Sequence, residues 1–153
     1  IRVPVLTREQ YAEIRSIRLA LEGLAAETAA GKVTAEQLQM LERNIRDNLE
    51  AVHCGDLIAA LKLNQAFHFA LADIAGMPLL RDMLDSLWMR TGPLIARAYG
   101  DFSERMAVEH HWEVLRALEK GDGTAARQAI CTDILDGNQK MMELIARREA
   151  TLA

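Results

Sequence analysis

Two polar side chains interrupt an apolar stretch of the sequence at residues 63–76, LNQAFHFALADIAG. Asn64 and His68 stand four residues apart, and at about 3.6 residues per turn this spacing places both on one face of a helix. The same face carries four apolar residues, namely Leu57, Leu61, Leu71 and Ala75. An amide and an imidazole that face an apolar core need polar partners there. The pattern therefore predicts that other segments supply such partners.

Two later segments also place a polar side chain on an apolar face. His111 shares a helical face with apolar residues three, four and seven positions later, which are Val114, Leu115 and Leu118. The adjacent His110 is rotated by about 100° from it, so the two histidines cannot both point squarely inward. Asp133 falls in the middle of a stripe formed by Ala126, Ile130, Gly137, Met141 and Leu144. A carboxylate in such a stripe is unfavourable unless it is paired or bound to a cation.

These residues together offer two imidazoles and two oxygen donors, a ligand set that suits a divalent transition metal such as zinc or nickel. The set is Asn64, His68, His111 and Asp133. The alternative is a buried hydrogen-bond network, in which Asp133 or a backbone carbonyl satisfies each histidine. Each residue alone favours the network, because an isolated core histidine is usually just hydrogen-bonded. Four such residues on three segments favour a metal or ligand pocket.

The segments that position these residues are predicted to be helices, because each has start and stop signals. Thr7 and Thr34 each open a capping box with a glutamine three residues later. The first helix should extend to Gly31, and its apolar stripe is expected at Ile14, Ile17, Leu21, Leu24 and Thr28. The second helix should end before residues 55–56, and Gly76 is placed to end the third as a C′ glycine.

Three more helices are expected in the second half of the chain. Pro78 suits the first turn of the fourth helix. Residues 92–93, Gly-Pro, should kink or break this helix, because the proline ring clashes with the preceding turn. The fifth helix is expected from residues 101–103 to residues 120–121, and the sixth, capped by Asp122, through Ile145 with fraying at residues 147–149.

The expected elements define the fold class. No segment shows sustained alternation of apolar and polar residues, so no strand is predicted. A chain of 153 residues is long enough for one domain with one core. We therefore predict an all-α, antiparallel bundle of about six helices over residues 7–150. Residues 1–6 are expected to be a linker from a preceding domain.

Composition excludes several classes of protein. The chain is 50% hydrophobic and 26% charged, as is usual for a soluble globular protein, and it has no apolar run of the roughly 18 residues that span a membrane. Its net charge of −4 argues against nucleic-acid binding by this chain itself. Cys54 and Cys131 fit no CxxC pattern, so the sequence suggests neither disulfides nor a thiolate zinc site. A cytoplasmic location is the default expectation.

Four motifs occur in an order that is familiar from one family. They are IRxxLE at residues 17–22, FHxxL at 67–71, PLLxxxLxSLW at 78–88 and HxxxLRALxxGD at 111–122. Over about residues 8–148 the chain resembles the FCD effector-binding domain of FadR-type regulators in the GntR family. Members of this family couple an all-helical ligand domain to an N-terminal winged helix-turn-helix that binds operator DNA as a dimer. The resemblance implies the same fold and role here.

The resemblance also implies a metal site. Many domains of the family hold a metal ion through an aspartate and a histidine four residues apart, plus two further histidines. The histidine of this pair corresponds to His68, and the next to His111, which lies ten residues before Gly121 as the family pattern requires. The aspartate position holds Asn64 here, and the last histidine position holds Asp133. The exchange keeps one carboxylate in the set but moves it to the opposite side.

The resemblance implies a ligand as well. The metal of the family commonly receives a carboxylate from a small organic acid effector, which an arginine of the first helix helps to bind. Arg18 corresponds to this arginine, and a guanidinium suits bidentate recognition of a carboxylate. An equally weighted alternative is a surface ion pair between Arg18 and Glu22, four residues later. Trp88 is expected to be a core residue, since large aromatic side chains usually serve packing.

The leading hypothesis is therefore a ligand sensor, the effector-binding and homodimerisation module of a transcription regulator, and not an enzyme. It would control operator DNA only through a winged helix-turn-helix domain that precedes Thr7, and it would need no membrane. A second hypothesis is a small helical metalloenzyme whose His/Asp cluster activates water. No further inward acid or base is placed to shuttle protons in such an enzyme. A third hypothesis is a structural helical module with a polar core network.

Overall fold

The structure is a computed structural model that describes residues 6–99 and 104–152. Six helices account for most of these residues, and no strand is found among them. The helices are α1 (Arg8–Ala30), α2 (Ala35–His53), α3 (Leu57–Ala75), α4 (Pro78–Tyr99), α5 (Glu104–Glu119) and α6 (Gly123–Leu152). Within the described part of the chain, no helix is long and apolar enough to cross a membrane. The predicted all-α fold of six helices is confirmed.

The helix ends follow the capping chemistry of the sequence. The side chains of Thr7 and Thr34 accept hydrogen bonds from backbone N–H groups three residues later, and both capping boxes are complete. Gly76 ends α3 with a φ of 69°, a left-handed conformation that favours glycine. Asp122 accepts a hydrogen bond from the backbone N–H of Ala125 and so caps α6. Local sequence therefore fixes where most of these helices begin or end.

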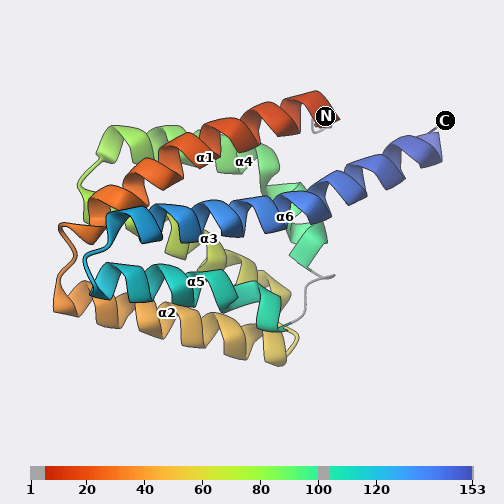
Figure 1. Cartoon of the computed structure of the whole chain (residues 1–153). Helices are drawn as coiled ribbons and strands as arrows, with labels where there is room; N and C mark the ends of the chain where they lie inside the picture. Colours follow the sequence, from red (N-terminus) through yellow and green to blue (C-terminus); the bar gives the residue numbers. More distant parts are fainter. Residues whose placement is uncertain (1–5, 100–103, 153) are drawn as a thin grey trace.

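Successive helices run in alternating directions and form an antiparallel bundle (Figure 1). The most extensive packing is between α1 and α6, and α2 packs against both α3 and α5. One side of helix α3 packs against α1, α2 and α4. The start of α1 and the end of α6 lie at the same end of the molecule (Figure 1). Side chains of α3 therefore face several other helices at once.

The predicted inward stripe of α1 is correct at Ile14, which is buried, and wrong at two other positions. Ile17 and Leu24 are 37% and 40% exposed. The buried face is instead formed by Tyr11, Ile14, Arg18, Glu22, Ala25, Ala26 and Ala29. Small residues on this face let α1 approach α6 closely, since a Cβ atom added at Gly23 would lie 3.3 Å from the sulfur of Cys131. Close helix packing, rather than the size of the apolar side chains, decides which face turns inward.

The second halves of α4 and α6 test two predictions. Of the kink or break predicted at residues 92–93, the break is not found: α4 continues through Pro93 to Tyr99, and Figure 1 shows that the helix bends in its second half. Helix α6 continues to Leu152 through the residues expected to fray. Its last part is tied to the start of the chain by an ion pair from Glu149 to Arg8 and a hydrogen bond from Arg148 to the carbonyl of Leu6. The expected start of the fifth helix at 101–103 and residues 1–5 of the expected linker lie outside the described residues.

Candidate functional site

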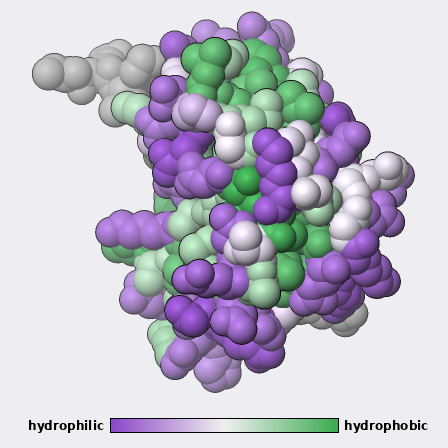
Figure 2. Space-filling model, turned by 90° about the vertical axis from the view of Figure 1, so that its left-hand side faces the viewer, coloured by the Kyte–Doolittle hydropathy of each residue, from purple (hydrophilic) through white to green (hydrophobic). Residues whose placement is uncertain are grey.

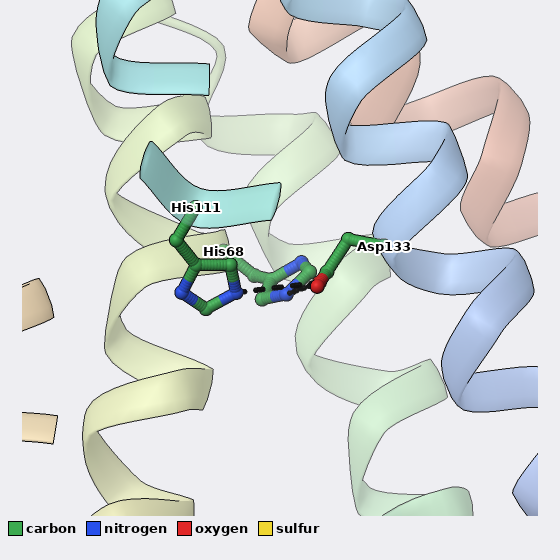
Figure 3. A group of neighbouring side chains, drawn as sticks. All are labelled: His68, His111 and Asp133. Carbon is green, nitrogen blue, oxygen red and sulfur yellow. Dashed lines mark hydrogen bonds and ion pairs between the residues drawn. The ribbon is translucent and has the colours of Figure 1, made fainter. Parts of the chain in front are cut away.

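Polar side chains from α3, α5 and α6 meet inside the bundle. His68, His111 and Asp133 each offer one ligand atom, and these atoms all lie within 4.8 Å of one another. Both Nε2 atoms face the same carboxylate oxygen: His68 at 2.9 Å and His111 at 3.3 Å from Oδ2 of Asp133. Figure 3 shows the three side chains pointing toward one another. Three of the four predicted ligands therefore converge.

The cluster is shielded from water. His68 and His111 are buried, and the side chain of Asp133 is 15% exposed. The ring of Phe67 stacks on that of His111 with centroids 4.1 Å apart and an angle of 4° between the planes. Among the described residues, Nδ1 of His111 has no hydrogen-bond partner. Stacking on Phe67 therefore holds this imidazole in the absence of a hydrogen bond at Nδ1.

Asn64, the fourth predicted ligand, is not part of these contacts. It is half-buried, and none of the polar contacts that the structure gives for the cluster involves it. Four residues turn a helix by about 400°, so Asn64 lies about 40° away from His68 around α3 and one turn nearer its start. The i, i+4 spacing places both residues on one side of the helix, but it does not bring them to the same partners.

The sequence interpretation missed Glu22 as a member of the site. Its carboxylate is 1% exposed, and it accepts a hydrogen bond from Nδ1 of His68 at 2.5 Å. Arg18 donates to the same carboxylate through Nε at 2.7 Å. The Arg18–Glu22 pair therefore exists, but it is buried rather than on the surface as the alternative interpretation had it. The row of small residues Ala25, Ala26 and Ala29 on the same face is the signal that could have located Glu22 inward.

Trp88 lies in the core, as expected, but it also borders the site. The guanidinium carbon of Arg18 lies 4.5 Å from the centre of the Trp88 ring, a cation–π contact. The centroid of the His68 ring lies 5.3 Å from that of Trp88. Helix α4 therefore helps to hold Arg18 and His68.

His110 is not part of the cluster of His68, His111 and Asp133. Its Nε2 atom pairs with Asp136 at 2.5 Å, and its Nδ1 atom lies 3.3 Å from Glu113. Its side chain is partly exposed, whereas His111 is fully buried. This arrangement agrees with the prediction that only one of the two adjacent histidines points squarely inward.

With this geometry established, comparison with known proteins places the chain in a family. Residues 13–136 match the FCD domain. The chain belongs to the FCD domain family. The sequence resemblance and the expected fold are thereby confirmed for this FCD domain.

The relatives of this FCD domain are transcription regulators by name. The HTH-type transcriptional regulator McbR of Escherichia coli (strain K12) is 28% identical over 131 residues, which cover 84% of this chain and 59% of that protein. The HTH-type transcriptional repressor RspR of the same organism is 26% identical over 129 residues, covering 84% of this chain and 57% of that protein. The chain thus spans less than two thirds of the length of these curated relatives.

Two solved structures share the fold. A structure of McbR/YncC from E. coli has a TM-score of 0.83 and 25% sequence identity, covering 92% of this chain and 72% of that chain. A GntR structure from Streptococcus agalactiae has a TM-score of 0.69 and 28% identity, covering 81% of this chain and 56% of that chain. The chain is therefore an effector-binding FCD domain of the GntR type. Such a domain is regulatory and not an enzyme, so the metalloenzyme alternative is set aside.

The charges in the site of the FCD domain stabilise one another. Burial lowers the pKa of His68, but the carboxylates of Glu22 and Asp133 oppose this effect and raise the pKa to about 9. Burial raises the pKa of Asp133, but the two imidazoles outweigh it and hold that pKa well below its usual range. Burial likewise raises the pKa of Glu22, and Arg18 and His68 outweigh it, so that its pKa is lowered. Without a bound metal, His68 is therefore an imidazolium between two carboxylates.

The donor set fits a divalent transition metal. Two imidazole nitrogens and one carboxylate oxygen, all able to point at one position, form a combination that zinc and its neighbours accept. Three protein ligands leave at least one coordination position for a ligand from solution. Asn64 stays a predicted fourth ligand, for which the geometry described above gives no contact. The contacts of Asp133 with His68 and His111 are also those of the alternative interpretation, a buried hydrogen-bond network.

Proposed function

We propose that this FCD domain senses a small organic acid that binds at a divalent metal ion held by His68, His111 and Asp133. The observation that carries the proposal is the convergence of three buried ligand atoms from α3, α5 and α6 within 4.8 Å. When bound, the metal supplies an electropositive centre for a carboxylate oxygen of the acid. The protein residues orient the ligand atoms, exclude water from most of the site and supply one negative charge through Asp133.

Arg18 is the second anchor that we propose for the acid. It is buried beside the site, and its only described hydrogen bond uses Nε, so its two terminal nitrogens remain for a carboxylate. Stacking on Trp88 fixes the plane of the guanidinium. Glu22 and Trp88 thereby hold the guanidinium of Arg18 in place beside the site.

A thermal-shift experiment tests this function. Small carboxylates such as acetate, pyruvate and succinate should raise the melting temperature in the presence of zinc, since a ligand at a hundredfold excess over Kd adds roughly 2.7 kcal/mol of stability. Arg18→Lys keeps the charge that faces Glu22 but loses the planar fork, so the shift should shrink while the parent melting temperature is largely kept. Arg15→Lys, at a partly exposed position on the same helix, is the matched control. An identical shift in Arg18→Lys and the parent would remove Arg18 from the site.

We further propose that the domain controls DNA through another part of a longer protein. The relatives named above are HTH-type regulators, and this chain covers only 57–59% of their length. The chain is acidic, with a net charge of −4, which does not suit sequence-specific binding to DNA. A preceding winged helix-turn-helix domain would read the operator, and such a regulator would act in the cytoplasm.

The outer surfaces of α1 and α4 support a proposed homodimer. They carry large apolar side chains that are exposed in the single chain: Ile17, Leu24, Leu79, Met83 and Met89. Figure 2 shows hydrophobic residues gathered at the top of the molecule, the level at which Figure 1 places these two helices. Exposed apolar side chains of this size favour association.

We expect the isolated domain to form a dimer without specific DNA binding. Light scattering should give twice the mass of the 17.1 kDa chain. Met89→Glu, which places a charge on the proposed interface, should shift the domain toward monomer, whereas Ile58→Glu on the exposed side of α3 should not. A monomer at every accessible concentration would exclude the dimer, and sequence-specific retardation of DNA by the isolated domain would exclude the second half of the prediction.

A further inference from the structure

Glu22 is a buried carboxylate with two partners on opposite sides. One oxygen, Oε1, accepts from His68 at 2.5 Å, and the other, Oε2, accepts from Arg18 at 2.7 Å. Only 1% of the residue is exposed. Moving a carboxylate out of water is unfavourable unless charged or hydrogen-bonded partners replace the water. The position of Glu22 is therefore fixed by Arg18 and His68 together.

The two nitrogens of His68 have different tasks. Nδ1 is committed to Glu22, while Nε2 faces Asp133 at 2.9 Å and belongs to the group of converging ligand atoms. An imidazole that binds a metal through one nitrogen carries its proton on the other, and an acceptor for that proton fixes the orientation of the ring. We propose that Glu22 is a positioning residue, which holds His68 with Nδ1–H toward itself and Nε2 toward the metal centre. This inference rests on the metal site of the proposed function.

The support for His68 extends through two further helices. Glu22 lies on α1, and its partner Arg18 stacks on Trp88 of α4 at 4.5 Å. His68 is thus held from outside the centre by a series of contacts that begins at Trp88. His111 is held differently, because its ring stacks on Phe67 and its Nδ1 has no hydrogen-bond partner among the described residues. Loss of Glu22 should therefore disturb only one of the two imidazoles.

Zinc titration of the purified chain tests the proposal. Glu22→Gln keeps the shape of the side chain but removes its charge, and we expect zinc affinity to fall about 10- to 100-fold, as is usual when such an outer partner is lost. Glu27→Gln is the matched control on the same helix, because Glu27 forms an exposed ion pair with Arg127. It should leave zinc affinity unchanged. Equal affinity in Glu22→Gln and the parent would overturn the role of Glu22.

Nitrogen-15 spectra of the imidazole rings separate positioning from a merely structural role. In the zinc-loaded parent, His68 should be coordinated through Nε2 and should carry a hydrogen-bonded proton on Nδ1. In Glu22→Gln this proton signal should move, while the signals of His111 stay in place. Coordination of zinc through Nδ1 of His68 in the parent would overturn the proposal without any variant, so the test does not depend on folding of Glu22→Gln.

The same spectra distinguish failure of this inference from failure of the metal site. A parent chain that binds no zinc would contradict the proposed function. The Nδ1–H signal of His68 in the parent and in Glu22→Gln would then still decide whether Glu22 holds the imidazole of His68. A signal that moves in the variant supports the contact with Glu22, and one that does not move overturns it.

Discussion

Replacing His68 by alanine is expected to destabilise the metal-free domain by about 3–5 kcal/mol, the largest loss that we predict for a single substitution. His68 donates hydrogen bonds to Glu22 and to Asp133, and both carboxylates lie inside the bundle. Without the imidazolium, these two groups lose a shared positive partner in a medium that stabilises charge poorly. Urea unfolding of the chelator-treated protein measures the difference.

The stability of the metal-free domain should also depend on pH through His68. The pKa of His68 is about 9 in the folded domain, above the ordinary value of 6.5 that applies to the unfolded chain. Its contribution is therefore fully present below about pH 6.5 and is lost as the pH rises toward 9. The metal-free parent should lose stability on the order of 3 kcal/mol over this range from His68. His68→Ala should lack this part of the slope.

His110→Ala is the control for this prediction. His110 pairs with Asp136, whose side chain is 55% exposed, so its removal should change stability by no more than about 1 kcal/mol. A similar loss of stability in His68→Ala and His110→Ala would mean that the buried ion pairs of His68 do not stabilise the fold more than the exposed pair of His110. A His68→Ala domain as stable as the parent would contradict the charge arrangement described for the site.

Asp133→Asn is expected to release the metal. Asp133 supplies the only formal negative charge among the three converging ligands, and its Oδ2 atom faces both imidazoles. An amide oxygen binds a divalent cation more weakly than a carboxylate does, so zinc affinity should fall by more than the roughly 100-fold expected for an outer-shell partner. Competition with a chromophoric chelator measures this loss. Asp136→Asn, one turn further along α6 and exposed, should bind zinc as the parent does.

Asn64→Asp provides the opposite test at the fourth predicted position. Restoring a carboxylate there should tighten zinc binding if this side chain can reach the centre. Asn64 is half-buried and lies one turn before His68 on α3. Unchanged affinity in Asn64→Asp, together with loss in Asp133→Asn, would define a site of three protein ligands. Equal zinc affinity in the parent, Asn64→Asp and Asp133→Asn would contradict a metal site at these residues.

The sequence predicted the helices well because their ends are local. Thr7, Thr34 and Gly76 each fix a helix end through contacts within a few residues, and such contacts follow directly from residue type. Whether Pro93 kinks α4 or breaks it could not be decided from the sequence, because this depends on packing of the flanking residues against other helices. Local rules alone cannot report such packing.

The site was predicted in part for the same reason. His68, His111 and Asp133 each stand out as polar residues on an apolar stripe, so their inward orientation could be inferred one helix at a time. Glu22 could not be recognised in this way, because the stripe chosen for α1 contained Ile17 and Leu24, which are exposed. The true buried face is made of small residues that pack closely against α6, and apolar periodicity gives such residues little weight.

The most direct test of the central claim is native mass spectrometry of the purified domain combined with elemental analysis. The proposed site predicts about one divalent transition metal ion per chain, retained in the folded parent and lost in Asp133→Asn. A folded parent without metal, joined by an Asn64→Asp variant that is equally free of metal after incubation with zinc, would contradict the claim that His68, His111 and Asp133 form a metal centre.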